Sequence, residues 1–92
     1  MKTGVVWKYE LWPQGSFTLT LPAGWTFRHL DTQRLSIRPQ MWVEVDPNAG
    51  TYDVKFKMVL TGEKFDPATH RYLGTVLLHG GDFVSHLYQV IE

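Results

Sequence analysis

The chain of 92 residues contains no cysteine. Disulfide scaffolds, thiolate zinc sites and cysteine nucleophiles are therefore excluded. The chain also has no excess of either charge, with nine basic and nine acidic residues and a formal net charge of zero. Proteins that coat nucleic acid without sequence preference normally carry a clear basic excess. General nucleic-acid binding is therefore not expected, and the length predicts one domain over residues 1–92.

No stretch approaches the roughly 20 apolar residues of a membrane-spanning helix. After the first four residues only Val5 and Val6 precede Trp7 and Lys8, which is too short an apolar run for a signal peptide. These absences predict a cytoplasmic protein with no membrane partner. The sequence also lacks a phosphate-binding glycine loop and a nucleophile elbow. We therefore expect no enzyme, no catalytic residues and no cofactor.

Apolar and polar residues alternate with a period of two along most of the chain, which is typical of half-buried strands. In the longest alternating run, residues 52–61, Val54 and Phe56 share one face and Lys55 lies on the other. Strands are expected over residues 5–11, 16–21, 25–30, 35–37, 41–46, 52–61, 72–79 and 82–91. One helical turn is expected after Asp66-Pro67. This pattern predicts an all-β fold, a single small antiparallel sandwich or partly open barrel of seven to eight strands with a C-terminal β-hairpin.

The C-terminal hairpin has apolar residues on both faces. Gly80-Gly81 suits a two-residue type I′ turn, which requires positive φ twice. That turn pairs Leu77 with Val84 and, four residues further along the strand, Leu73 with Tyr88. Either the hairpin is packed on both sides within one chain, or one face forms an interface between copies. A chain this short has little material to cover both faces, so we expect a homo-oligomer.

Cationic side chains provide a candidate site for an anion. Arg28, Arg34 and Arg38 lie close together in the sequence, and the planar guanidinium suits bidentate contact with phosphate. Lys57 adds a cation on a second strand face. The alternative interpretation is a solvated face with surface ion pairs. Because the net charge is zero, these cations favour a local pocket, such as one shared between two copies, over a broad basic field.

Aromatic residues near these cations suggest how the rest of a ligand would be held. The chain has four Trp in 92 residues, more than a minimal core needs, so some are expected to face a partner or ligand. Tyr9 or Trp42 would stack a base, because every base has a face that packs on an aromatic ring. His86 would hydrogen-bond a polar edge of the ligand.

A metal site at the hairpin is not expected. His79, Asp82 and His86 have the residue types of zinc ligands. However, the hairpin register places the rows of His79 and His86 four positions apart, about 13 Å at ~3.3 Å per residue. Ligands of one zinc ion must lie much closer than this.

Three segments carry a resemblance to a known family. They are WKYEL at residues 7–11, MWVEVDP at residues 41–47, and YLGTV at residues 72–76, which continues through HGG at residues 79–81 to Val84, His86 and Tyr88. Their order resembles that in a family of small phage-encoded β-rich proteins of unknown function. The likeness spans most of the chain and departs over residues 28–40, where the arginines lie. It implies a phage setting, in the cytoplasm of an infected host cell.

The leading hypothesis is a non-catalytic phage accessory protein that acts as an anti-defence sponge. It would sequester a small anionic ligand, a cyclic or ADP-ribose-type nucleotide immune signal, in pockets of a homo-oligomer. Its site would comprise Arg28, Arg38, Lys57, Tyr9, Trp42 and His86. The alternatives are an inhibitor that docks on a host enzyme, a small nucleotide-cleaving enzyme using His79 or His86, and a virion component.

Overall fold

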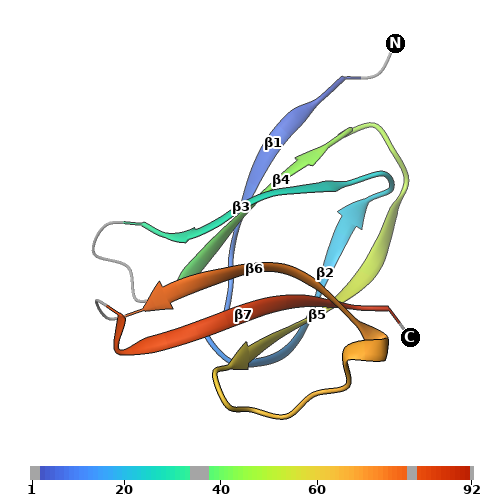
Figure 1. The fold of residues 1–92 in the computed structure, drawn as a ribbon. Helices are drawn as coiled ribbons and strands as arrows, with labels where there is room; N and C mark the ends of the chain where they lie inside the picture. Colours follow the sequence, from blue (N-terminus) through green and yellow to red (C-terminus); the bar gives the residue numbers. More distant parts are fainter. Residues whose placement is uncertain (1–2, 34–37, 79–80, 92) are drawn as a thin grey trace.

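Two antiparallel sheets pack face to face in the computed structural model, which describes residues 3–33, 38–78 and 81–91 (Figure 1). One sheet has the order β1-β4-β3, with bounds Val5–Glu10, Pro39–Val45 and Thr26–Thr32. The other has the order β2-β5-β7-β6, with bounds Gly15–Pro22, Thr51–Leu60, Phe83–Val90 and His70–Leu78. The predicted all-β sandwich is confirmed, and its sheets do not close into a barrel. The strand expected at residues 35–37 lies outside the described residues.

The expected helical turn is confirmed as a short 3-10 helix, η1 (Pro67–Thr69). The Asp66 carboxylate accepts a hydrogen bond of 2.9 Å from the Ala68 amide, which caps the turn. Pro67 occupies the first helical position, where no amide hydrogen is required. Among the described residues there is no helix with the length and apolar character needed to cross a membrane.

The period-two pattern places one face of each sheet in the core. In β4, Met41, Val43 and Val45 are buried, while the alternate residues Trp42 and Glu44 are partly exposed. This strand is central in its sheet, and Pro39 is tolerated there because it is the first residue of the strand.

Phe56 of β5 is the largest side chain that the core encloses completely. Its ring stacks on Phe17 of β2 at 5.4 Å and meets the Trp25 ring at 5.8 Å. These distances are typical of favourable aromatic pairs. Through these contacts Phe56 of β5 packs against both β2 and the residue that precedes β3.

The two sheets approach each other most closely where β3 passes β6. Gly74 of β6 lies against β3, and a Cβ atom placed there would lie 3.4 Å from Phe27 Cζ and 3.5 Å from Leu30 Cβ. Each strand is irregular at this point, with register shifts between Phe27 and His29 in β3 and between Tyr72 and Gly74 in β6. The missing side chain and the two bulges together allow the sheets to meet here.

Because of the bulge in β6, the hairpin register differs from the predicted one over part of its length. Near the turn the expected partners are confirmed, including Leu77 with Val84. Beyond Gly74 the prediction is wrong, because the extra residue shifts the register and Tyr72, not Leu73, pairs with Tyr88. The rings of Tyr72 and Tyr88 therefore meet at 5.5 Å on the outer face. The turn residues 79 and 80, with the expected pairing of His79, lie outside the described residues.

The chain itself covers part of the second apolar face of the hairpin. The segment after β5 crosses the outer face of the four-stranded sheet, where Phe65 contacts the Tyr88 ring at 4.5 Å. Val59 points to the same face and is only 2% exposed. Nearer the turn, Leu77 remains 61% exposed. The homo-oligomer stays a prediction.

Replacing Gly74 with Val should destabilise the fold by about 1–3 kcal/mol, because the added methyl groups must fit between β6 and β3. The matched control is Gly50→Val, since no atom lies within 4 Å of a Cβ built at Gly50. The control should change the free energy of unfolding by no more than about 0.5 kcal/mol. Urea unfolding of both variants measures the difference, and equal stability would contradict the close approach.

Candidate binding site

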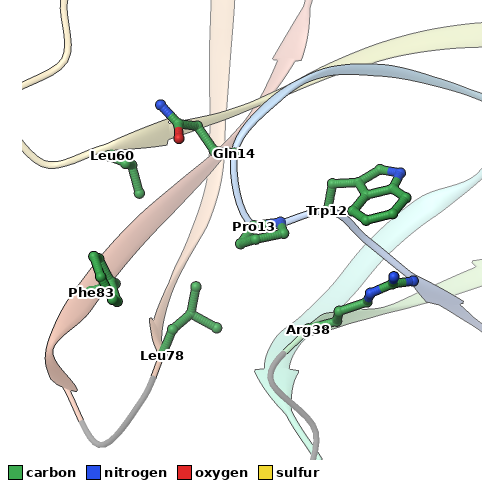
Figure 2. A pocket seen from close by; sticks show the side chains of 7 residues that line it. All are labelled: Trp12, Pro13, Gln14, Arg38, Leu60, Leu78 and Phe83. Atoms are coloured by element: carbon green, nitrogen blue, oxygen red, sulfur yellow. The ribbon is translucent and has the colours of Figure 1, made fainter.

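A pocket of about 350 Å³ opens at one end of the sandwich (Figure 2). The turn between β1 and β2, the starts of β4 and β7 and the ends of β5 and β6 meet there. It is lined by Trp12, Pro13, Gln14, Arg38, Leu60, Leu78 and Phe83. The lining is mainly apolar, and the polar side chains are Gln14 and Arg38.

Two long-range hydrogen bonds fix the wall that the β1–β2 turn forms. The buried Ser85 hydroxyl of β7 donates to the Pro13 carbonyl at 2.6 Å. The Leu11 amide donates to the Pro39 carbonyl at 2.9 Å. Because each bond ties the turn to a different sheet, the wall does not depend on a ligand for its position.

Two large aromatic side chains stand at the pocket and remain accessible. Trp12 is 58% exposed and Phe83 is 53% exposed. Exposed aromatic rings beside an apolar pocket are typical of a surface that binds a partner. In Figure 2 Phe83 and Leu78 lie across the hollow from Pro13, and Arg38 lies below Trp12.

Arg38 brings positive charge to the pocket. Its guanidinium lies 4.1 Å from the centre of the Trp12 ring, a cation–π contact. It also donates to the Glu10 carboxylate at 2.8 Å. Both members of this ion pair are about half exposed, so solvent screens the attraction. The guanidinium can therefore exchange Glu10 for another anion at modest cost.

Arg28 and Trp42, two other predicted site residues, lie on the outer face of the three-stranded sheet. Arg28 donates to the Glu44 carboxylate through Nη2 at 2.9 Å and Nε at 3.1 Å. The Trp42 ring lies beside His29 with the ring centres 5.6 Å apart. Arg28 thus forms a surface ion pair, as expected if this arginine lies on a solvated face and not in an anion site.

Lys57 and His86 lie on the outer face of the other sheet. Lys57 Nζ is 3.8 Å from the Glu63 carboxylate. His86 contacts two threonine hydroxyls, with Nδ1 2.9 Å from Thr75 Oγ1 and Nε2 3.0 Å from Thr61 Oγ1. One ring nitrogen of neutral histidine donates and the other accepts, so both hydroxyls can be satisfied. This network holds the ring in place between β6 and the segment after β5.

Tyr9, the last predicted site residue, lies on the inner side of β1. It pairs with Met41 and packs against the edge of the core. Burial raises the pKa of its hydroxyl above the ordinary value. Desolvation is the cause, because burial penalises the charged phenolate more than the neutral phenol.

The six predicted residues therefore do not meet in one pocket of a single chain. Arg38 lines the pocket, while the others occupy the two outer faces and the inner side of β1. The sequence interpretation missed Trp12 and Phe83 as site residues. The turn residues after Trp12 were a usable signal, since a tryptophan that borders a turn is often accessible. The described residues contain no group of three or more acidic or histidine side chains placed to hold a metal ion.

Residues 2–92 match a family described as a domain of unknown function (DUF7352). The chain belongs to this family. No curated protein and no solved structure matches it.

The raised pKa of Tyr9 predicts a loss of stability in alkali. Above about pH 10 the unfolded chain releases the Tyr9 proton first, so the unfolded state binds fewer protons and the free energy of unfolding falls as pH rises. Tyr9→Phe removes this contribution and should make the fall with pH shallower. Urea unfolding between neutral pH and pH about 11 measures the slope. If the free energy of unfolding fell equally steeply with pH in the wild type and the variant, the pH dependence would not come from Tyr9.

Proposed function

We propose that this protein is a non-catalytic binding protein that sequesters a small ligand carrying a flat ring and an anionic group. Nucleotides have both parts. The observation that carries the proposal is the pocket between Trp12 and Phe83, with the Arg38 guanidinium beside it. It supplies an aromatic surface and a cation within one hollow.

The pocket has the size and chemistry for such a ligand. Small-molecule sites commonly enclose about 300–1,000 Å³, and this pocket encloses about 350 Å³. A base that stacks on an aromatic side chain gains about 1–3 kcal/mol. A phosphate that replaces Glu10 at Arg38 would gain the bidentate geometry that guanidinium offers. A half-exposed ion pair contributes only about 0–1 kcal/mol, so giving it up opposes binding weakly.

The biological setting of the proposal rests on the sequence resemblance to phage-encoded proteins. In that setting the ligand would be a cyclic or ADP-ribose-type nucleotide immune signal of the host, held without cleavage. Arg28, Trp42, Lys57 and His86 would contribute only where a second copy brings one outer face to the pocket of its neighbour. This assembly is part of the proposal.

A second candidate function is an inhibitor that docks on a host protein. The mainly apolar lining of the pocket favours it, as does the Arg38–Glu10 ion pair, which already neutralises the cation. Tryptophan and arginine are the residues most enriched at energetic centres of protein interfaces. An apolar side chain of a partner would then fill the pocket.

The test is incubation of the purified protein with cyclic dinucleotides, cyclic trinucleotides and ADP-ribose derivatives, followed by filtration. We expect one nucleotide to be depleted from the filtrate and released intact when the protein is heated. Phe83→Ala should weaken its binding about 5- to 150-fold, since one stacked base is worth about 1–3 kcal/mol. Arg38→Ala should weaken binding without unfolding the chain.

Ile91→Ala is the matched control, because Ile91 is an exposed apolar residue beyond the end of β7, whereas the pocket lies at the start of that strand. It should bind as the wild type does. Recovery of a converted nucleotide would make the protein an enzyme. Recovery of the whole panel in the filtrate would overturn nucleotide sequestration. A stoichiometric complex with a host protein that Phe83→Ala abolishes would establish the second function instead.

A further inference from the structure

A second hollow, of about 320 Å³, lies at the opposite end of the four-stranded sheet from the first. The first pocket is bordered by the end of β5 and the start of β7, whereas the second is bordered by the start of β5 and the end of β7. Its lining includes Trp25, Phe27, Tyr52, Arg71 and Gln89. It combines aromatic rings with an amide and a guanidinium, and it is more polar than the first pocket.

The aromatic wall of this second hollow is held by contacts within the chain. The Trp25 indole Nε1 donates to the Tyr52 hydroxyl at 2.9 Å. The same indole packs on the buried Phe56 ring at 5.8 Å. Trp25 is thus fixed between the core and Tyr52, while Tyr52 is 48% exposed. A ring-shaped ligand would meet a wall that needs no rearrangement.

Gln89 carries a polar atom that the described part of the chain leaves without a hydrogen-bond partner. Its Oε1 atom is shielded from solvent and has no hydrogen-bond partner among the described residues. A buried acceptor without a partner destabilises the folded state, and an apolar side chain of similar size would avoid that cost. The Oε1 atom therefore adds no hydrogen bond within the described residues to the stability of the fold.

Arg71 offers donors beside the same hollow. It is exposed, and its side chain makes no ion pair or hydrogen bond with the described residues. Its guanidinium has five N–H donors and no acceptor. Gln89 and Arg71 are also register partners on β7 and β6, which fixes them next to each other.

We infer that this hollow is a second binding site, for a small ring with an apolar face and N–H or O–H donors at its edge. Sugars and nucleosides share this chemistry. The apolar face would pack on Trp25 and Tyr52, a ligand donor would pair with Gln89 Oε1, and a ligand acceptor would receive a hydrogen bond from Arg71. Gln89 Oε1 reaches the ligand by rotation about χ3, a torsion with a broad and shallow energy profile. The inference does not depend on the first pocket.

The experiment is titration of the full, ¹⁵N-labelled protein with glucose, N-acetylglucosamine, adenosine and uridine, read by NMR. The Gln89 side-chain amide and the Trp25 indole N–H are identified by their loss in Gln89→Leu and Trp25→Phe. We expect both signals to shift and saturate with the sugars or with the nucleosides, and the responding set identifies the source of the ring. Gln89→Leu should weaken binding at least about tenfold, which is the loss of roughly one good hydrogen bond.

Two controls separate this site from the first pocket and from an effect on folding. Gln14→Leu alters the amide at the first pocket and should leave these titrations unchanged. Gln89→Leu should melt no lower than the wild type, because it removes an unsatisfied buried acceptor. The inference is overturned if neither signal shifts at millimolar probe concentrations, or if Gln89→Leu binds as the wild type does. Either result would leave the nucleotide test at Phe83 and Arg38 unaffected.

Discussion

The contact between β3 and β6 at Gly74 is the constraint on which the arrangement of the two sheets depends. These are the strands at which the sheets come closest, and a glycine on one side with a bulge in each strand makes the approach sterically possible. Away from this side the sheets are separated by full layers of core side chains, with Phe56 enclosed between them. The hollows at the two ends of the four-stranded sheet lie where this layer of side chains ends.

Much of the fold could be predicted from the sequence because the core is encoded in a local period of two. The alternation at β4 and β5 identifies inward residues without knowledge of their partners, and the Asp66-Pro67 pair identifies the helical turn. The hairpin register was predictable up to Gly74, since a two-glycine turn fixes its first pairs. The predicted register is wrong beyond Gly74 because β6 has an extra residue at a bulge there. This bulge lies where β6 approaches β3, a strand distant in the sequence, and no residue of the hairpin itself indicates that approach.

The candidate site was much less predictable, for a related reason. Cations and aromatic residues can be recognised as types, but the surface they reach depends on strand order. Arg28 and Arg38 are ten residues apart in the numbering, yet one pairs with Glu44 on an outer face and the other stands over Trp12 at a pocket. The second hollow could not be predicted either, because Gln89 and Arg71 become register partners only through the shift in β6.

The hydrogen bond between the Ser85 hydroxyl and the Pro13 carbonyl joins residues 72 positions apart. It ties the turn after the first strand to the last strand of the chain. During synthesis the first pocket therefore cannot take its final shape while β7 is still within the ribosome. Contacts between such distant residues also form late and slowly in folding, because a long loop must close before they contribute. The wall formed by the β1–β2 turn is thus complete only when β7 is in place.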